Sequence, residues 1–235
     1  MVLKTGLRSF LNLFFPRCCI VCDGLLAETE VFLCVKCNME LPRTNFHLQQ
    51  GQGRIMERLL QGQFPLVRAT SFFFYNKGSR FNEIIYQLKY KGNKELGEVM
   101  GRCMATELLS SGFFTGIDLL IPIPLHPKKR KLRGYNQSEQ IAQGLSHITG
   151  IPVITSHSER RKNTDTQTRK SAIGRQENIQ GAFRLHDPSF FTRKHVLIVD
   201  DVWTTGATIG EFISAFQHTK DVRISVFTMA VTQWE

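Results

Sequence analysis

One segment, residues 196–208, constrains the fold more than any other part of the chain. It begins with four consecutive apolar residues, continues with two adjacent acids and ends in a turn of small and hydroxyl-bearing residues. An apolar run of this length is typical of a buried strand, and ligands of open α/β sheets bind beyond the carboxyl ends of such strands. The segment therefore predicts an α/β fold with a ligand site after this strand. The acids are Asp200 and Asp201, and the turn is Thr204, Thr205, Gly206, Ala207 and Thr208.

The turn and the acids suit different parts of a phosphorylated sugar. Backbone N–H groups of the turn, with the threonine hydroxyls and the start of the next helix, can surround a phosphate, and Gly206 lets the backbone approach closely. Asp200 and Asp201 are poorly suited to a phosphate but can accept hydrogen bonds from two neighbouring ribose hydroxyls. The alternative is an ordinary strand, turn and helix with surface acids. Repulsion between adjacent carboxylates disfavours that purely structural role.

Apolar runs and helical periodicities alternate through the remaining chain. Runs rich in apolar and β-branched residues predict strands over 67–75, 117–123, 195–199 and 224–231. Apolar residues at helical spacing predict helices over 81–88, 96–108, 136–150 and 209–216, with a pause at Gly92-Asn93. Strands that alternate with helices predict a parallel sheet flanked by helices on both faces.

Single residues within these helices also have expected roles. Asn136 can cap the helix that follows it, with Glu139 reaching back in a capping box, and Gly150 should end that helix. Cys103 falls among apolar helical residues, so we expect it in the core rather than at a metal.

The cysteines separate the N-terminal part of the chain from the rest, because five of the six lie between positions 18 and 37. Cys19-x-x-Cys22 and Cys34-x-x-Cys37 are eleven residues apart, and each pair can present two thiolates from one tight turn. Together they predict a structural zinc ion in a closed tetrahedral site. The expected cytoplasmic setting disfavours a disulfide pair, and the duplicated motif disfavours a thioredoxin-like redox site. Cys18 could replace Cys19, although the spacing to Cys22 favours Cys19.

These features divide the chain into three parts. Residues 1–45 hold the zinc-ribbon-like cysteine module and a short amphipathic helix, because apolar residues near the N-terminus fall at helical spacing. Residues 46–65 form a polar connector with one or two helical turns around 55–60, and residues 66–235 form the main domain. No cleavage site of a secretion signal follows the N-terminus, and no apolar stretch approaches the ~20 residues that span a bilayer. We therefore expect a soluble, cytoplasmic protein.

The excess of basic residues is concentrated in one stretch. The chain has 30 Lys and Arg against 20 Asp and Glu, and twelve of the basic but only four of the acidic residues lie between positions 122 and 184. This distribution favours a polyanionic partner, either a diphosphate or a nucleic-acid backbone. A basic surface without any ligand is the alternative.

Three of these basic residues, Lys128, Arg130 and Arg133, follow the strand predicted to end near position 123. The carboxyl end of that strand should lie near that of the Asp200 strand, so the cations could meet a diphosphate. Arg133 is the strongest candidate, because Gly134 and the start of a helix hold its bidentate guanidinium. A solvated basic loop is the alternative. Residues 164–175 are polar and without apolar periodicity, which indicates a flexible lid that could exclude water during a transfer reaction.

Segment 196–208 resembles the phosphoribosyl pyrophosphate signature of type I phosphoribosyltransferases, since its apolar run, acid pair and Thr-Gly-x-Thr end all match. The resemblance implies a type I phosphoribosyltransferase-like parallel sheet. It further implies that Asp200 and Asp201, as catalytic residues, hold the 2- and 3-hydroxyls of ribose and that the turn holds the 5-phosphate. In the same family Mg²⁺ bridges the diphosphate.

The order of several further motifs resembles the ComF/GntX family of competence-associated proteins over nearly the whole chain. The family implies a role in handling single-stranded DNA during natural transformation, or in nucleotide salvage. Arg169-Lys170-Ser171 departs from the family's pattern, where a more apolar residue is expected after Gln167. Besides the cysteine pairs, the motifs are Leu88-Lys89-Tyr90-Lys91-Gly92-Asn93, residues 121–127, Arg133-Gly134-Tyr135-Asn136-Gln137-Ser138, Thr164-x-x-Gln167, Arg175-x-x-Asn178 and Gly181-Ala182-Phe183.

Two functions from different classes follow. In the first, the domain binds phosphoribosyl pyrophosphate or a nucleotide and, if it is an enzyme, transfers the ribosyl group, with His126 a candidate base by position only. In the second, the chain is a non-catalytic single-stranded DNA-binding adaptor to a competence helicase. Its nucleotide site would then act as a sensor, and Tyr90 and Tyr135 near the cations would stack on bases. A pure zinc-ribbon DNA binder is a weaker third reading, because few cations flank the cysteines.

Overall fold

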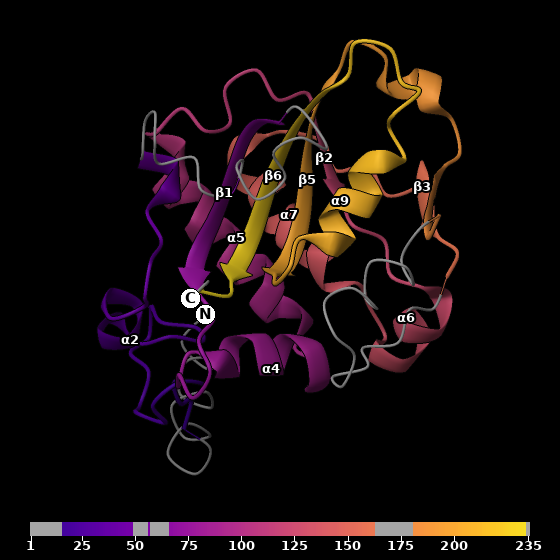
Figure 1. Ribbon diagram of the computed structural model, residues 1–235. Helices are drawn as coiled ribbons and strands as arrows, with labels where there is room; N and C mark the ends of the chain where they lie inside the picture. The colour runs from indigo at the N-terminus through magenta and orange to yellow at the C-terminus, as the bar shows by residue number, and fades with distance from the viewer. Residues whose placement is uncertain (1–15, 49–55, 57–65, 163–180, 234–235) are drawn as a thin grey trace, which may run out of the picture.

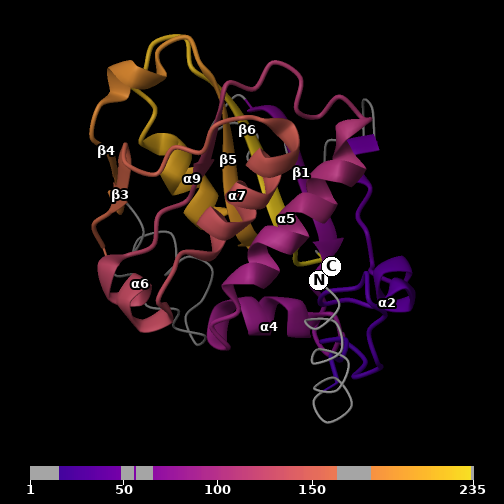
Figure 2. The same cartoon turned by 180° about the vertical axis from the view of Figure 1, so that it is seen from behind.

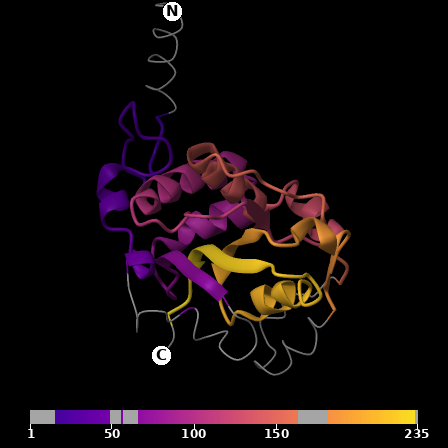
Figure 3. The same cartoon turned by 90° about the horizontal axis from the view of Figure 1, so that it is seen from above.

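The computed structural model describes residues 16–48, 56, 66–162 and 181–233 (Figure 1). The amphipathic helix expected in residues 1–15 and the lid expected over 164–175 lie outside the described residues. So do the helical turns expected around 55–60, apart from Met56. The described parts of the chain form one central sheet with helices around it, and the cysteine module lies at one side (Figure 3).

A four-stranded parallel sheet forms the centre of the molecule. Its strand order is β1-β6-β5-β2, and every neighbouring pair runs parallel. The strands lie within a few residues of the predicted ones, so the parallel α/β fold is confirmed. β5 extends beyond the predicted apolar run and includes the two acids. The bounds are Leu66–Phe74 for β1, Leu119–Pro122 for β2, His195–Trp203 for β5 and Arg223–Val231 for β6.

Helices cover both faces of this sheet. α5 (Lys94–Leu109) and α7 (Gln137–Thr149) lie on one face (Figure 2), and α9 (Ala207–Ser214) lies on the other (Figure 1). α4 (Asn82–Tyr90) lies below the arrowheads of β1, β6 and β5 in Figure 1, and α6 (Pro127–Arg133) lies beside them at the same end. This end of the sheet is the one where the sequence predicts the ligand site.

Smaller elements complete the described chain. A short antiparallel pair, β3 (Ser158–Arg160) and β4 (Phe183–Leu185), stands apart from the main sheet. The cysteine module contains α2 (Val35–Met39), and two 3-10 turns, η1 and η3, span Phe46–Leu48 and Pro188–Phe191. Within the described residues, no helix combines the length and the apolar character that crossing a membrane requires.

Side chains of β5 alternate between two hydrophobic cores. Leu197 and Val199 belong to the core that includes α5 and α7, whereas Val196 and Ile198 belong to the core that includes α9. All four are fully buried. A strand covered on both faces has no polar side, which explains the uninterrupted apolar run in the sequence.

α5 and α7 contact each other directly through glycines. A Cβ atom added to Gly144 would lie 2.2 Å from the carbonyl oxygen of Glu98, and one added to Gly101 would lie 2.4 Å from that of Ile141. Neither position has room for a side chain, because interiors at this density contain no spare volume. The two helix backbones therefore approach as closely as their own atoms allow.

Three of the predicted helix boundaries are confirmed by their caps. Asn93 accepts a hydrogen bond from the N–H of Leu96 at 3.2 Å and so begins α5 after the predicted break. Asn136 caps α7, accepting from the N–H of Ser138 at 3.2 Å. Gly150 ends α7 in the left-handed conformation, at φ 72°.

Two expectations about single side chains are wrong. Cys103 is exposed, because α5 buries the stripe that contains Met100 and Met104 and Cys103 lies away from it. Glu139 does not complete a capping box within the described residues, because its carboxylate pairs instead with Arg130, at 3.2 Å from Nη2.

The cysteine module is joined to the main sheet by the segment 41–44. The N–H of Thr44 donates to the carbonyl oxygen of Phe72 at 3.0 Å, and the N–H of Phe74 donates to that of Pro42 at 2.8 Å. Arg43 adds an ion pair with Glu107 of α5, 2.7 Å from Nε to Oε1. The module thus packs on β1 and α5. The limits of the three parts at residues 45 and 65 stay a prediction.

Replacing Gly144 by Ala should destabilise the protein. The new Cβ atom would overlap the carbonyl oxygen of Glu98, so α5 and α7 must separate, and overpacking of this kind costs ~1–3 kcal/mol. Urea unfolding followed by circular dichroism should show a lower midpoint than that of the wild type. Gln143→Ala, on the exposed side of α7, is the matched control and should change stability by less than ~0.5 kcal/mol. Equal midpoints for Gly144→Ala and wild type would contradict the close contact.

Candidate functional site

The acid pair lies where β5 runs past the end of its neighbour. β2 pairs with β5 only as far as Pro122, opposite Val199, whereas β6 continues beside β5 as far as Trp203. Asp200 and Asp201 therefore lie beyond the end of β2, at the carboxyl end of the sheet (Figure 1). This is the end at which open α/β sheets bind their ligands.

Groups from β5, α4 and α7 contact the carboxylates. The Oγ atom of Ser138, in the first turn of α7, donates a hydrogen bond to Oδ1 of Asp200 at 2.8 Å. The backbone N–H of Asp201 donates to the same oxygen at 2.9 Å. Lys89, near the end of α4, places Nζ 3.3 Å from Oδ2 of Asp201. The acid pair is thus compensated by groups from β5 and from two helices.

The surroundings of Asp200 favour its protonated form. Burial raises the pKa of Asp200, and the carboxylate of Asp201 raises it further, to about 7. The hydrogen bonds from Ser138 and from the Asp201 N–H oppose this shift, as does the charge of Lys89. Near neutral pH the Asp200 carboxyl is therefore protonated for part of the time. A ligand that brings hydrogen-bond donors or a cation would favour its ionised form.

The turn after β5 leads directly into the start of α9. Gly206 has φ 76°, a left-handed conformation that glycine adopts without strain. A Cβ atom at this position would lie 3.1 Å from Nε1 of Trp203. Thr204 and Thr205 are exposed, and Thr208 lies in the first turn of α9. Exposed hydroxyls and the N–H groups of a helix start can face an anion.

Two side-chain hydrogen bonds help to hold the turn. Oγ1 of Thr205 accepts a hydrogen bond from the N–H of Ala207 at 3.4 Å. Oγ1 of Thr232 donates to the carbonyl oxygen of Thr204 at 3.3 Å, which fixes the start of the turn to the residue after β6. The first contact is long, so a phosphate could replace it at little cost.

The three basic residues predicted to meet a diphosphate lie on a helix rather than on a loop. α6 spans all three, so their side chains leave the helix axis in different directions. Lys128 is exposed, Arg130 pairs with Glu139, and the guanidinium of Arg133 lies 5.8 Å from the ring centroid of Tyr90 on α4. No contact between these three cations and the acid pair is formed within the described part of the chain.

Tyr135 is buried against the last turn of α4. Its hydroxyl donates to the carbonyl oxygen of Leu88 at 2.5 Å. Burial raises the pKa of Tyr135, the charge of Arg133 lowers it and that of Asp201 raises it, so both charged groups lie near this hydroxyl. Tyr135 is only 4% exposed, so the prediction that it stacks on bases is wrong, whereas Tyr90 is 66% exposed.

His126 has a structural contact at the start of α6. Its Nδ1 atom accepts a hydrogen bond from the N–H of Lys128 at 3.2 Å, which makes it the cap of this helix. A ring nitrogen that accepts here is occupied, so the structure gives no support to His126 as a base.

Sequence reasoning missed three residues near the acids: Lys89, Ser138 and Arg160. Burial lowers the pKa of Arg160 and the charge of Asp200 opposes this shift, so the guanidinium lies near that carboxylate. It also lies 5.1 Å from the ring centroid of Phe183. Lys89 and Ser138 fall within two of the motifs that carried the family resemblance, and this was the available signal. No motif marks Arg160.

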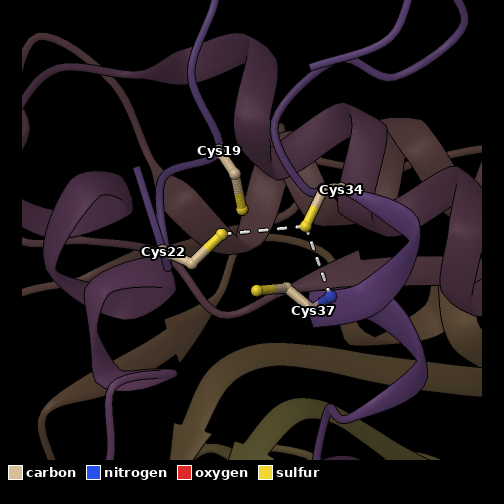
Figure 4. Close-up of side chains that lie close together, drawn as sticks. All are labelled: Cys19, Cys22, Cys34 and Cys37. Carbon is tan, nitrogen blue, oxygen red and sulfur yellow. Dashed lines mark hydrogen bonds between the residues drawn. The ribbon is translucent and has the colours of Figure 1, made fainter. Parts of the chain in front are cut away.

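The four paired cysteines bring their sulfur atoms together (Figure 4). The Sγ atoms of Cys19, Cys22, Cys34 and Cys37 all lie within 4.8 Å of one another, and those of Cys22 and Cys34 are 3.8 Å apart. Tetrahedral coordination with metal–sulfur bonds of ~2.3 Å separates the sulfurs by ~3.8 Å. The cluster can therefore hold a metal ion. Cys18 does not belong to it, because its Sγ atom contacts the carbonyl oxygen of Pro16 at 3.7 Å.

Tight turns aim these thiols at a common point. Asp23, at φ 57°, lets the N–H of Cys19 donate to the carbonyl oxygen of Gly24 at 2.8 Å. Sγ of Cys34 accepts from the N–H of Cys37 at 3.4 Å at the start of α2. Burial raises the pKa of Cys37. Burial also disfavours the Cys19 thiolate, but backbone N–H groups, that of Cys34 foremost, outweigh it and lower the pKa of Cys19 to about 7.

The parallel sheet, the acid pair before a threonine-glycine turn and the N-terminal cluster of four cysteines define a protein of phosphoribosyltransferase-like fold with a module that can hold a metal ion. The chain is 31% identical over 217 residues to the DNA utilization protein YhgH of Escherichia coli O6:H1, covering 91% of this chain and 90% of the relative. It therefore belongs to the ComF/GntX family, as its motifs indicated.

Two further relatives carry competence names. Competence protein F of Haemophilus influenzae is 35% identical over 114 residues, covering 48% of this chain and 50% of the relative. Competence protein ComFC of Bacillus subtilis is 21% identical over 220 residues, covering 81% and 85%. A scan against known protein families finds no match. The crystal structure of a purine phosphoribosyltransferase from Pyrococcus horikoshii matches with TM-score 0.34 and 16% identity over 57% of this chain and 82% of that one, too distant to carry an argument.

Asp200→Asn should stabilise the protein, and the gain should grow with pH. The pKa of Asp200 is raised in the folded protein from 3.8 to about 7. Between these values the folded state holds a proton that the unfolded state has released, so the stability of the wild type falls as pH rises to about 7 and then levels off. Asparagine keeps an acceptor for Ser138 but never ionises. The gain should reach at most ~4 kcal/mol above pH 7, since each pKa unit corresponds to ~1.4 kcal/mol.

Urea unfolding of both proteins at acidic and at alkaline pH measures this difference. Asp187→Asn is the control, because a hydrogen bond from Ser189 lowers the pKa of this exposed acid and its loss should bring no gain. A stabilisation by Asp200→Asn of the same size at every pH would contradict the shifted pKa.

Proposed function

We propose that the acid pair and the turn after it bind phosphoribosyl pyrophosphate or a related nucleotide. The single observation that carries the proposal is the position of Asp200 and Asp201, beyond the end of β2 and just before the helix start at Gly206. One ligand that has vicinal hydroxyls next to a phosphate would engage both features. A ribose 5-phosphate has this chemistry.

Each group in the site has a part in this proposal. Asp200 and Asp201 accept hydrogen bonds from the ribose hydroxyls, and N–H groups and hydroxyls of residues 204–208 surround the 5-phosphate. The cations of α6 that would approach the diphosphate are Lys128, Arg130 and Arg133. In a transfer reaction such charges would stabilise the leaving diphosphate.

The acids also fit a magnesium ion. Carboxylate oxygens are the ligands that Mg²⁺ prefers, and the raised pKa of Asp200 belongs to a carboxyl that a nearby cation would ionise. A bound Mg²⁺ would neutralise charge on the diphosphate. Lys89 already supplies one positive charge at Asp201, so binding of a divalent cation there requires this ion pair to loosen.

The names of the relatives support a setting for this chemistry. They are called DNA utilization and competence proteins, and we extend this association to the present chain, as a role in DNA uptake during natural transformation or in nucleotide salvage. The alternative is a non-catalytic single-stranded DNA-binding adaptor to a competence helicase. An adaptor would bind DNA with a steep salt dependence and without any need for Asp200.

Calorimetric titration with phosphoribosyl pyrophosphate and Mg²⁺ tests the site. The wild type should bind, and omission of Mg²⁺ or the change Asp201→Asn should weaken binding by about tenfold or more. Without Mg²⁺ the diphosphate loses charge compensation, and without the Asp201 carboxylate a ribose hydroxyl loses a charge-assisted hydrogen bond, each worth at least ~1.4 kcal/mol. Asp187→Asn should bind as the wild type does. Adding purine and pyrimidine bases and measuring diphosphate release would then reveal any turnover. A wild-type protein that does not bind phosphoribosyl pyrophosphate would overturn the proposal.

We also propose that the four-cysteine cluster holds zinc in a structural role. Thiolates are preferred zinc ligands, and a site filled by four protein ligands leaves no position for a reacting water. The packing of the module on β1 and α5 supports a role in stability.

Metal analysis of the purified protein should find close to one zinc ion per chain. Cys22→Ser and Cys37→Ser should lower this content and the melting temperature, because each removes a ligand. Cys18→Ser and Cys103→Ser are matched controls outside the cluster and should leave both values unchanged. Full zinc content in Cys37→Ser would rule out the four-thiolate site.

A further inference from the structure

We propose that Tyr86 and Tyr90 of α4 form a platform on which a nucleobase stacks, next to the acid pair. The two residues are one helical turn apart, and their ring centroids are 5.4 Å apart. The inference rests on the proposed nucleotide site, which would bring a ligand close to α4. The capacity to stack a base comes from the two tyrosine rings of α4.

The platform faces solvent. α4 buries Ile84, Ile85 and Leu88 against the core, and this leaves Tyr86 45% exposed and Tyr90 66% exposed. Two large rings on a nine-residue helix therefore contribute little burial to the fold. An accessible aromatic face offers stacking to any base, because every base has a π-face.

Each ring is accompanied by a cation. Nζ of Lys91 lies 5.6 Å from the ring centroid of Tyr86, and the guanidinium of Arg133 lies 5.8 Å from that of Tyr90. Within the described residues neither cation pairs with a carboxylate, in contrast to Lys89. Lys91 and Arg133 can therefore turn to a phosphate while a base occupies the ring next to it.

The platform is linked to the candidate site through Lys89, the residue before Tyr90. Lys89 precedes Tyr90 and reaches Oδ2 of Asp201. The carbonyl oxygen of Leu88 accepts a hydrogen bond from the hydroxyl of Tyr135. The charges of Arg133 and Asp201 both shift the pKa of this hydroxyl, in opposite directions. A ligand whose ribose hydroxyls contact the acids would thus have an aromatic surface beside it. The ligand class is a nucleobase that carries phosphate, supplied either as a mononucleotide or as part of a single strand.

Binding measurements on the full chain separate stacking from charge. A fluorescent oligothymidylate and an abasic oligomer of equal length and charge are compared by anisotropy. Uridine and adenosine monophosphates, which carry both ribose hydroxyls, are compared by calorimetry. Tyr90→Ala should weaken the base-containing ligands about tenfold, the size expected for loss of one stacked base. It should leave the abasic oligomer and phosphoribosyl pyrophosphate unchanged. Tyr90→Trp should restore binding, because it restores a ring.

Two controls test the other parts of the platform. Leu132→Ala removes an apolar side chain of α6 that is 86% exposed and should change nothing, since it offers no ring. Lys91→Gln should lower the salt slope of oligonucleotide binding by about one.

The outcomes also identify the source of the base and separate this inference from the proposed function. Equal losses for mononucleotides and oligomers would indicate a small nucleotide, and a loss confined to oligomers would indicate a single strand; either supports the platform. Tyr90→Ala that binds bases as tightly as the wild type, or an abasic oligomer bound as tightly as oligothymidylate, would overturn it and leave the patch as a protein contact. Base-dependent binding by a chain that fails to bind phosphoribosyl pyrophosphate would reject the proposed function alone.

Discussion

The arrangement of residues at the carboxyl end of the sheet depends on two neighbouring carboxylates at the end of a buried strand. Asp200 loses hydration and faces the charge of Asp201, and both effects raise its pKa to about 7. Ser138 and Lys89 reach the pair from α7 and α4, helices that the chain forms before β5. A strand with no ligand to bind would gain stability from an apolar residue here, because a buried charge costs free energy unless it is compensated. The acid pair therefore lowers the stability of the fold, a cost that the proposed ligand site would explain.

α4 connects the acid pair with the surface around it. Its last turn contributes an ammonium group to Asp201 from Lys89, a carbonyl oxygen to Tyr135 from Leu88 and an exposed ring to Arg133 from Tyr90. Three consecutive residues thus face three different partners, because successive residues of a helix point ~100° apart. One short helix thus contacts Asp201, Tyr135 and Arg133, three residues that all lie far from it in the sequence.

The sequence predicts what local pattern decides. The apolar runs of the strands, the break before Asn93 and the cysteine spacing all have a local physical cause, and each is confirmed. Contacts between residues far apart in the sequence have no local pattern that predicts them. The ion pair of Lys89 with Asp201 is such a contact. α6 is not among the predicted helices, because a helix without buried residues gives no apolar periodicity, although Pro127 at its first position and Gly134 after its end are helix signals. The binding roles of the acids and of the turn stay predictions.

The glycine contact between α5 and α7 has a consequence for the mobility of the site. Backbones that touch at Gly101 and Gly144 cannot slide past each other without a clash, so Ser138 at the start of α7 is held in a constant position relative to the sheet. α4 packs on α5 through side chains, with Cδ1 of Leu88 3.0 Å from the point where a Cβ atom of Gly97 would lie. Its covalent link to α5 is the short segment 91–93 with a left-handed glycine, Gly92, at φ 69°. In the proposed site, adjustment to ligands of different size would therefore fall to α4, because side-chain packing and a glycine joint yield more readily than the backbone contact of the paired helices.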